Sequence, residues 1–403
     1  MSVATALRRM PPPSALNSER AFACVLGDTD LLRALSLAGI RCAVAAAPGS
    51  PPRYSRLARV ALDWADAWEQ PALLLELLER FGAAQAEPPV LFYEEDRDLL
   101  LVSRHRERLR RHFRFVVPDA ALVEDLVDKC RFQALAQRLD LPVPAARALD
   151  PRTDPVPLDL RFPVALKPLV RRGERWDPIA AGAKALRLDS PLTLVTLWPR
   201  LAVADVPVLL QELIPGPETR VESYHVYVDE RGDLVGEFTG RKIRTWPPEY
   251  GDSTALVITD APDVTVLGRE LVGRLELRGV AKLDFKRAPD GRLYLLEVNP
   301  RFTLWHHLGA RAGVNLPALV YADLVGLPRP RVPKARAGVR WCSPWRDAVA
   351  ARAAGVSLLR WLPWALGCEA KRVVAWDDPM PLLGAVLWRS VSRVRRLGRG
   401  PRA

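Results

Sequence analysis

The stretch LDFKRAPDGRLYLLEVNPR, residues 283–301, has two apolar segments separated by a Pro-Asp-Gly turn. Two such segments joined by a short turn that contains glycine predict an antiparallel β-hairpin. Residues two apart on a strand project from the same face, so Glu297 and Asn299 should point together. Asp284, on the first strand, can face them from the neighbouring strand. The hairpin therefore predicts three oxygen-bearing side chains at one place.

These three side chains suit a Mg²⁺ site, because Mg²⁺ takes few protein ligands and completes its octahedron with waters and phosphate oxygens. Arg301, two residues after Asn299, could meet a phosphate or a carboxylate through two parallel hydrogen bonds. The alternative is a solvated hairpin whose acidic residues only face water. We favour the metal site, since Asn-Pro-Arg after the buried-looking YLLEV has no evident structural purpose.

The N-terminal part of the chain alternates short apolar strands with helices, which is typical of an open α/β domain. Asp28 is available as the N-cap of the first helix. The expected strands cover residues 21–27, 40–47, 89–93 and 113–118, and the expected helices cover residues 28–39, 70–82 and 96–112.

A helix over residues 123–140 should connect this block to a second one, in which alternating strands follow one another through turns such as DERGD and APDG. Hairpins of this kind predict antiparallel sheets. The expected strands of the second block cover residues 161–169, 207–216, 221–243, 279–288 and 291–300, followed by a helix over 316–326. The change of pattern predicts two domains of different architecture.

The motif LEVNPR, preceded by a strand that carries an acid, resembles the metal-binding signature of the ATP-grasp enzymes. The resemblance spans residues 21–328. It implies an α/β N-terminal (pre-ATP-grasp) domain and an α+β, two-lobed ATP-grasp domain with antiparallel sheets. The predicted units are a disordered lead-in over 1–20, the N-terminal domain over 21–125, the ATP-grasp domain over 126–328 with lobes of about 126–208 and 209–328, and a basic C-terminal extension over 329–403.

The resemblance also implies a role for individual residues. Lys129 and Lys167, the latter in FPVALKP, match lysines that contact the ATP phosphates, and LLQELIPG resembles the hinge that reads adenine. The residues assigned to ATP are Lys129, Lys167, Gln211, Glu212, Leu213, Ile214 and, for the ribose, Glu218. The residues assigned to the metal are Asp284, Glu297 and Asn299, with two Mg²⁺ ions expected and Mn²⁺ as a substitute. The close relatives carry glutamate in place of Asp284.

Three basic residues are assigned to catalysis: Arg301, Lys282 and Arg244. Lys282 matches a residue that touches the transferred phosphate in some relatives. Arg244 belongs to the basic sequence GRKIRTWPPEYG and could bind an acceptor carboxylate or the γ-phosphate, or could lie on a polar strand edge. Arg171 and Arg172, in the loop expected to cover the phosphates, could contact them or be solvated. His306 and His307 have no third ligand at a suitable spacing, so packing or substrate contact is favoured over metal binding.

By the same resemblance, the reaction has two steps. The γ-phosphoryl group passes to a substrate carboxylate to form an acylphosphate, and an amine then displaces phosphate. This implies a carboxylate–amine ligase that acts on small-molecule substrates, similar to the D-aspartate ligases. The alternatives are a carboxylase or another acylphosphate-forming enzyme, and a non-catalytic ATP-binding protein associated with a membrane.

The net charge of +12 is confined to the C-terminal part of the chain, since residues 329–403 contain sixteen basic and four acidic residues. This segment also holds six of the twelve tryptophans, and residues 383–396 show the spacing of a helix with apolar and arginine faces. A basic amphipathic helix with tryptophan is typical of contact with an anionic membrane surface. A packed C-terminal appendage is an equal alternative, and nucleic-acid binding is the least favoured.

Five cysteines without a CxxC pair argue against a disulfide framework or a structural zinc site, and indicate a reducing compartment. The first twenty residues lack the apolar segment of a signal peptide. We therefore expect a cytoplasmic protein, peripheral to the inner face of the membrane if the basic extension binds lipid. The oligomeric state is not predicted.

Overall fold

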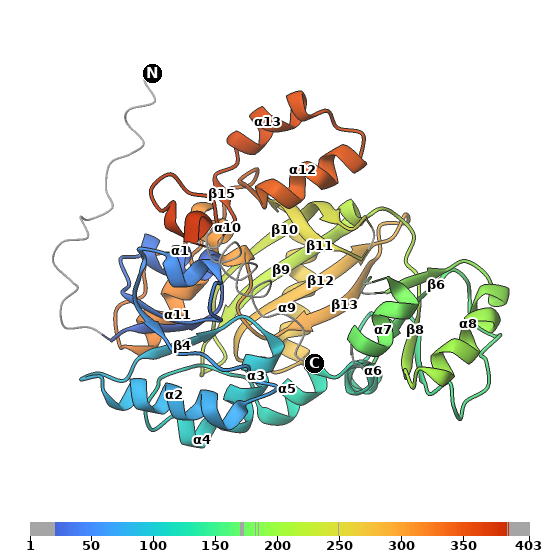
Figure 1. The fold of residues 1–403 in the computed structure, drawn as a ribbon, viewed down its shortest axis with the longest axis horizontal. Coiled ribbons are helices and arrows are strands. Elements are labelled where there is room, and N and C mark those ends of the chain that lie inside the picture. Colours follow the sequence, from blue (N-terminus) through green and yellow to red (C-terminus); the bar gives the residue numbers. More distant parts are fainter. Residues whose placement is uncertain are drawn as a thin grey trace, which may run out of the picture.

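The computed structural model describes residues 21–169, 173–181, 183, 185–248, 250–384 and 386. The expected lead-in, residues 1–20, lies outside this part of the chain. Figure 1 shows an N-terminal block in blue, a large sheet in yellow and orange, and a smaller lobe in green that stands apart. Each of these three parts contains one β-sheet.

The N-terminal block is built on a parallel sheet in the order β3-β2-β1-β4. Its strands are β1 (Ala23–Leu26), β2 (Cys42–Ala45), β3 (Ala58–Leu62) and β4 (Val90–Tyr93). Its helices are α1 (Thr29–Leu37), the 3-10 helix η2 (Pro51–Tyr54), α2 (Pro71–Ala83), α3 (Asp96–Arg104) and α4 (Arg106–Leu109). Every residue of β1, β2 and β4 is buried, as expected of strands in a parallel sheet. These apolar runs predicted the three strands correctly.

The predicted N-cap is confirmed, because the Asp28 side chain accepts a hydrogen bond from the backbone of Thr29. Two predictions for this block were wrong. The segment expected as a strand over 113–118 forms only an isolated bridge to β4, and the helix expected over 96–112 is interrupted at His105. The sequence also missed β3, whose residues are partly or fully exposed and form no apolar run.

Two helices, α5 (Ala120–Val127) and α6 (Lys129–Arg138), replace the single helix predicted over residues 123–140. Asp128 lies between them in an extended conformation, and its side chain accepts hydrogen bonds from the first backbone N–H groups of α6. Aspartate is a favoured cap at such a position. The break places Lys129 at the start of α6.

The smaller lobe contains an antiparallel sheet in the order β5-β8-β6-β7, with two helices packed against it. Its strands are β5 (Ala146–Leu149), β6 (Val164–Pro168), β7 (Leu186–Leu188) and β8 (Val208–Glu212), and its helices are α7 (Gly173–Ala180) and α8 (Pro191–Val203). Because β8 pairs within this sheet, the lobe boundary expected near residue 208 is misplaced. The chain leaves the small sheet after Glu212 and enters the large one through the 3-10 helix η3 (Glu218–Arg220).

The large sheet has the order β13-β12-β9-β10-β11-β14-β15 and is antiparallel except for its last pair of strands. Its first five strands in the chain are β9 (Val221–Val228), β10 (Leu234–Trp246), β11 (Asp252–Thr259), β12 (Gly279–Arg287) and β13 (Leu293–Asn299). Helix α9 (Pro262–Arg274) packs in one apolar cluster with β9 and β12, whereas α10 (Trp305–Arg311) and α11 (Leu316–Leu324) share another with β10 and β11. The antiparallel sheets predicted for this domain are confirmed.

The C-terminal extension is partly built into this sheet. It contributes β14 (Arg340–Cys342), α12 (Pro344–Ala353), α13 (Leu358–Leu366) and β15 (Ala370–Lys371). Strand β14 pairs with β11, and the side chain of Trp341 is fully buried. The packed C-terminal appendage, one of the two alternatives considered for the extension, is therefore what this segment forms. The amphipathic helix expected over 383–396 falls almost entirely outside the described residues.

No helix in the described ranges is both long enough and apolar enough to cross a membrane.

A buried ion pair ties α12 to the large sheet. The guanidinium of Arg244, on β10, donates two hydrogen bonds to the carboxylate of Asp347, at 2.8 and 2.6 Å. Asp347 is fully buried and also accepts from the hydroxyl of Thr254 and the indole N–H of Trp361, both at 2.8 Å. All four interactions converge on one carboxylate, so this residue holds the C-terminal extension to the sheet.

Replacing Asp347 by alanine should lower the free energy of unfolding by about 3–5 kcal/mol, because Arg244 would keep a largely buried charge without its partner. Urea denaturation followed by circular dichroism measures this change. The matched control is Asp63→Ala, which removes a carboxylate paired with Arg80 where both side chains are more than 70% exposed. The control should change the free energy by less than about 1 kcal/mol. Equal stability of the two variants would contradict a structural role for Asp347.

Candidate active site

A cavity of about 900 Å³ lies between the smaller lobe and the β12–β13 edge of the large sheet. Ten of the thirteen predicted site residues line it: Lys129, Lys167, Gln211, Glu212, Leu213, Ile214, Glu218, Asp284, Glu297 and Asn299. They come from α6, β6, β8, η3, β12 and β13 and from the segment between β8 and η3. The cavity thus brings together residues that are up to 170 positions apart in the chain.

The three predicted metal ligands lie at one end of the β12–β13 pair. Asp284 is directly opposite Glu297 in the register, and Asn299 is opposite Lys282. The amide of Asn299 donates to a carboxylate oxygen of Glu297 at 3.1 Å. The Asp284 side chain is buried, whereas that of Glu297 is 59% exposed. One acid is therefore held by the protein while the other faces the open cavity.

The buried acid is stabilised in its ionised form. The hydroxyl of Ser223 donates to Asp284 at 2.6 Å, and the Nζ atom of Lys282 lies 2.6 Å from its other oxygen. Burial alone would raise the pKa of Asp284, but Lys282 and Lys242 outweigh it and lower the pKa to about 2. Asp284 is therefore a carboxylate, which is the form that ligates a metal ion.

Two lysines line the cavity on the side of the smaller lobe. Lys129 donates to the backbone carbonyls of Pro168 and Leu169, and Lys167 donates to the side-chain oxygen of Gln211 at 2.8 Å. Burial lowers the pKa of each lysine, and the proximity of Lys167 lowers that of Lys129 further. Neither ammonium group forms an ion pair with a carboxylate among the described residues. Two partly compensated cations at the wall of a cavity favour an anionic ligand.

The segment between β8 and η3 has the form expected of a hinge. The Leu213 N–H donates to the carbonyl of Pro163 across the smaller lobe. The next backbone donor, Ile214 N–H, has no partner within the described part of the chain and belongs to a residue that lines the cavity. A free backbone donor beside a cavity can donate a hydrogen bond to the edge of a planar ring such as adenine.

Two further lysines, of which only Lys286 was missed by the sequence analysis, line the cavity. Lys242 and Lys286 both line the cavity, and their Nζ atoms lie 3.7 and 4.0 Å from the carboxylate of Glu218. Lys286 is on the same strand as Asp284, two positions later, so alternation along β12 could have identified it. Lys242 lies in the basic stretch from which Arg244 was selected.

Contrary to its selection as a catalytic residue, Arg244 does not line the cavity. Its guanidinium is bonded to Asp347 and lies 4.3 Å from the centre of the Trp364 ring, away from the cavity. The sequence could not distinguish the two basic residues, because the register of β10 against β11 shifts between Lys242 and Arg244. Such an irregularity changes which face a side chain projects from.

Arg301 and Lys282 lie next to the cavity and contact residues that line it. The Arg301 guanidinium donates to Asp96 at 2.5 Å, to the backbone carbonyl of Glu94 at 2.7 Å and to Asn299 at 3.1 Å. Burial would lower the pKa of Arg301, but the pairing with Asp96 raises it above its ordinary value. Arg301 therefore connects the hairpin to the carboxyl end of β4, where ligands bind in open α/β sheets.

Two other sets of predicted residues have different outcomes. Arg171 and Arg172, expected to cover the phosphates, lie outside the described residues. His306 and His307 are buried, with His307 3.2 Å from Asp30 and burial lowering the pKa of His306 to about 3. Within the described residues, no cluster of three or more His, Cys, Asp or Glu side chains could hold a metal by itself.

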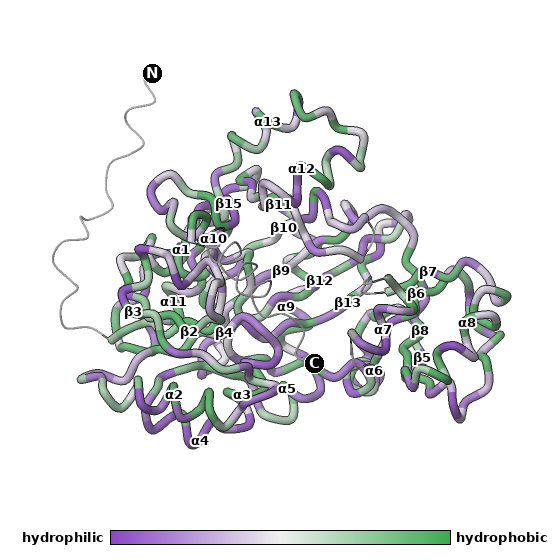
Figure 2. The backbone as a smooth tube through the Cα atoms, viewed as in Figure 1, coloured by the Kyte–Doolittle hydropathy of each residue, from purple (hydrophilic) through white to green (hydrophobic). Residues whose placement is uncertain are grey.

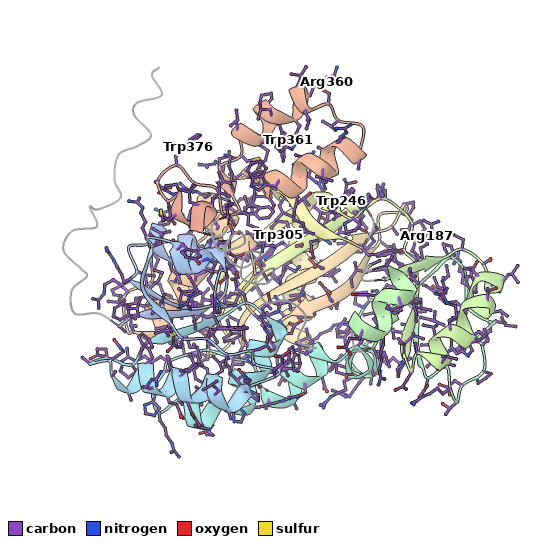
Figure 3. All side chains as sticks on the ribbon, in the orientation of Figure 1. Arg187, Trp246, Trp305, Arg360, Trp361 and Trp376 are labelled. Atoms are coloured by element: carbon purple, nitrogen blue, oxygen red, sulfur yellow. The ribbon has the colours of Figure 1, made fainter. Side chains whose placement is uncertain are left out.

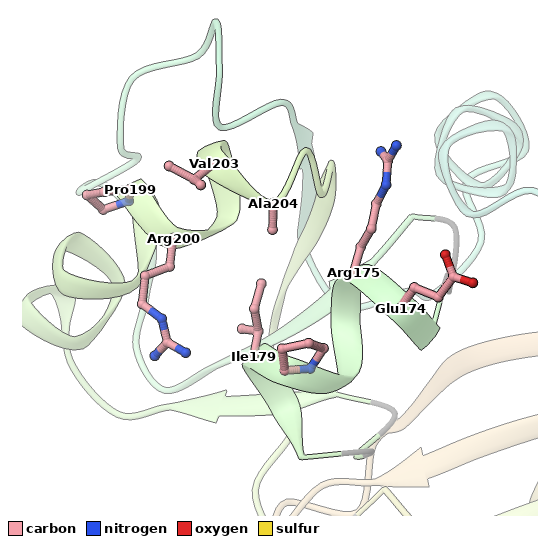
Figure 4. Close-up of a pocket in the computed structure, with 8 residues that line it drawn as sticks. Glu174, Arg175, Ile179, Pro199, Arg200, Val203 and Ala204 are labelled. Carbon is pink, nitrogen blue, oxygen red and sulfur yellow. The ribbon is translucent and has the colours of Figure 1, made fainter. Parts of the chain in front are cut away.

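A second hollow of about 530 Å³ lies on the smaller lobe between α7 and α8 (Figure 4). Aliphatic side chains such as Ile179 and Val203 form much of its wall, and its Arg175 is paired with Asp205. It contains no predicted site residue and no carboxylate pair. The larger cavity is therefore the better candidate for a reaction site.

Comparison with known proteins identifies the fold. Residues 205–343, which include β8, η3 and the β12–β13 hairpin, match the family model described as ATP-grasp in the biosynthetic pathway with Ter operon. The D-aspartate ligase of Enterococcus faecium is 24% identical over 292 residues, which cover 68% of this chain and 68% of that protein.

Solved structures with the same architecture are more distant in sequence. The ADP complex of purK, an N5-carboxyaminoimidazole ribonucleotide synthetase, has a TM-score of 0.60 and 17% identity, over 80% of this chain and 81% of that one. An L-amino acid ligase from Bacillus licheniformis has a TM-score of 0.58 and 13% identity, over 78% and 76% of the chains. The biotin carboxylase domain of the Hydrogenobacter thermophilus 2-oxoglutarate carboxylase, solved with MgADP, has a TM-score of 0.59 and 15% identity, over 80% and 74%. The chain has the ATP-grasp fold.

Replacing Lys167 by alanine should weaken ATP binding on the order of 10–100-fold, because a charge-assisted hydrogen bond contributes about 1.5–3 kcal/mol. Isothermal titration with Mg-ATP measures the change. The control is Lys334→Ala, which removes an exposed lysine paired with Asp260 and outside the cavity. If both variants bind ATP as the unmodified chain does, Lys167 does not contact the nucleotide.

Proposed function

We propose that this chain, which has the ATP-grasp fold, is a Mg-ATP-dependent ligase that joins a small-molecule carboxylate to an amine. The proposal rests on one observation: basic side chains and oxygen ligands for a metal line the same cavity. Lys129, Lys167, Lys242 and Lys286 line it together with the oxygen ligands Asp284, Glu297 and Asn299. A site that must bind a polyphosphate and a divalent cation at once requires both sets of groups.

The residues present fit both groups. The ammonium groups of Lys129 and Lys167 have backbone and amide oxygens as partners but no carboxylate within the described residues, so phosphate oxygens would balance their charge. Asp284, Glu297 and Asn299 offer two carboxylates and an amide oxygen, a donor set typical of Mg²⁺ with phosphate and water as remaining ligands. Mn²⁺ takes the same oxygen ligands.

When bound, Mg-ATP would supply the γ-phosphoryl group and a divalent charge that neutralises it. The side chains of this protein would then hold the reactants. Lys129 and Lys167 would bind phosphate oxygens, the backbone of Glu212, Leu213 and Ile214 would contact adenine, and Gln211 would orient Lys167. Glu218, between Lys242 and Lys286, would accept hydrogen bonds from the ribose.

The acid substrate should enter beside Arg301. This guanidinium is fixed by Asp96 and Asn299, so it can orient a carboxylate without losing the order of its own side chain. Lys282, 4.0 Å from Glu297, would stabilise charge on the phosphoryl group as it moves to the carboxylate. The resulting acylphosphate would react with the amine, forming the C–N bond and releasing phosphate.

Two further observations support a ligase. A sequence relative is named a D-aspartate ligase, and one structural relative is named an L-amino acid ligase. The purK and carboxylase structures share the same fold, which makes an ATP-dependent carboxylase the second candidate. A non-catalytic ATP-binding role is disfavoured because the side chains proposed for the reaction are all present and lie next to one another. They are Asp284, Glu297, Asn299 and Lys282.

We also propose a cytoplasmic location. All five cysteines are free, and four of them are buried in the core. Unpaired buried thiols are typical of proteins in a reducing compartment. ATP and small-molecule carboxylates and amines are available there as substrates.

The proposal predicts that Glu297→Gln and Asn299→Ala abolish Mg-dependent ADP release without unfolding the protein. Loss of a preorganised charge-stabilising group costs on the order of 10²–10³ in rate. The control Asp290→Asn changes an exposed acid in the turn of the same hairpin, paired with Arg292, and should keep full activity. ADP release is measured against panels of organic acids with and without amines, and hydroxylamine traps the acylphosphate as a hydroxamate.

Each outcome of this screen has a distinct meaning. Release of ADP that requires both an acid and an amine, together with hydroxamate formation, supports a ligase. Release of ADP that requires bicarbonate instead would establish the carboxylase. Full activity of both the Glu297 and Asn299 variants would refute the metal assignment.

A further inference from the structure

The α12–α13 hairpin, residues 344–366, presents an unusual amount of apolar surface to solvent. It projects from the rim of the molecule in Figure 1, and Figure 2 shows hydrophobic residues in green along α13. Leu359 is 88% exposed and Trp345 is 70% exposed. The exposed apolar residues of the hairpin are Trp345, Val349, Leu358, Leu359, Leu362 and Leu366. Contiguous apolar surface of this kind marks an interaction site.

The exposed residues form faces and are not scattered. On α13, Leu358, Leu362 and Leu366 follow a spacing of four, and Leu359 lies beside them, so the four occupy about a third of the helix circumference. On α12, Trp345 and Val349 are also four apart. The hairpin therefore carries an apolar face on each helix, and we name these six side chains the apolar crest.

The inner faces of the same helices are anchored to the body. Ala350, Ala351 and Ala365 are buried, and Asp347 binds both Arg244 on the large sheet and the indole N–H of Trp361 on α13. Arg346 donates to Asp252 on β11. One side of the hairpin thus packs against the protein. The apolar crest consists of the side chains that remain exposed after this packing.

The exposed charged side chains of the hairpin are all basic. Arg352 and Arg360 are exposed and form no ion pair with any described residue, and Figure 3 shows Arg360 at the outer margin of the hairpin. The only acidic residue within 344–366 is Asp347, which is buried and paired. The hairpin is therefore an apolar surface with positive charge beside it and no exposed carboxylate.

We propose that the apolar crest docks this protein on an anionic lipid surface, with Trp345 and the leucines of α13 in the headgroup region. Tryptophan and leucine flanked by arginine are the composition of helices that lie in the membrane interface. Exposed arginines without carboxylate partners attract anionic lipid headgroups. Nine residues are too few to span a bilayer, so α13 lies along the surface and does not cross it.

Docking through this surface leaves the candidate active site open. The hairpin packs over β10, β11 and β14, whereas the metal-binding residues lie on β12 and β13 at the other edge of the same sheet. The proposal is independent of the reaction. It assigns the membrane contact expected of residues 329–403 to the α12–α13 hairpin, whereas the expected amphipathic helix lay further along the chain.

The test is co-sedimentation of the full chain with vesicles of phosphatidylcholine alone or with about a third phosphatidylserine. The unmodified chain should bind the mixed vesicles more strongly. Leu359→Asp combined with Leu362→Asp should reduce binding on the order of tenfold or more, because two charges would enter the interface. The matched control is Leu192→Asp, an exposed leucine on α8 far from the hairpin, which should bind as the unmodified chain does.

A second variant separates charge from apolar contact. Arg352→Glu combined with Arg360→Glu should abolish the preference for phosphatidylserine, while 0.5 M salt should release the unmodified chain only in part. Thermal unfolding of every variant checks that the fold is retained, and the arginine variant keeps the test decisive if the leucine variant unfolds. The proposal fails if the unmodified chain ignores the mixed vesicles or if both double variants bind as it does. It also fails if the leucine variant only converts a dimer to a monomer by light scattering, which would make the apolar crest an interface between two copies.

Discussion

Pairing of β12 with β13 places a buried carboxylate, Asp284, directly opposite a more exposed one, Glu297. Two carboxylates this close repel each other unless cations compensate them. Lys282 contacts Asp284 at 2.6 Å and lies 4.0 Å from Glu297, so the hairpin carries its own counter-charge. Among the other lysines that line the cavity, Lys286 lies on the same hairpin, and Lys129, Lys167 and Lys242 come from α6, β6 and β10.

The lysines of α6 and β6 have a different kind of hydrogen-bond partner. Lys129 and Lys167 reach the cavity from α6 and β6, and their partners are neutral oxygens. Burying a cation beside neutral groups is unfavourable, which the lowered pKa of each lysine reflects. A protein retains such an arrangement where an anionic ligand restores the balance. This contrast between cations with carboxylate partners near Asp284 and cations with only neutral partners separates the proposed metal site from the proposed phosphate site.

The C-terminal extension shows how one buried carboxylate can organise a surface. Asp347 receives hydrogen bonds from Arg244, Thr254 and Trp361, and these contacts fix α12 and α13 on the edge of the large sheet. With Arg346 and Asp347 bonded to the sheet, the hairpin has apolar side chains on the outside, together with Arg352 and Arg360, which form no ion pair with a described residue. The ion pair between Arg244 and Asp347 thus connects a residue that was predicted to act in catalysis with the C-terminal extension that was predicted to bind membranes.

The sequence by itself predicted the β12–β13 hairpin from local alternation, and the resemblance of its motifs to those of the ATP-grasp enzymes predicted the fold and the ATP-binding residues among the ten that line the cavity. Glu297 and Asn299 share a face because they are two positions apart on one strand, and Asp284 faces Glu297 across the hairpin. The tertiary structure alone decided the role of Arg244, since a register shift in β10 and a carboxylate 103 residues away determine where it points. It also decided that β8 belongs to the smaller lobe and that residues 340–371 belong to the large sheet. Strand partners and ion pairs between remote segments leave no local pattern in the sequence, so only the packed chain reveals them.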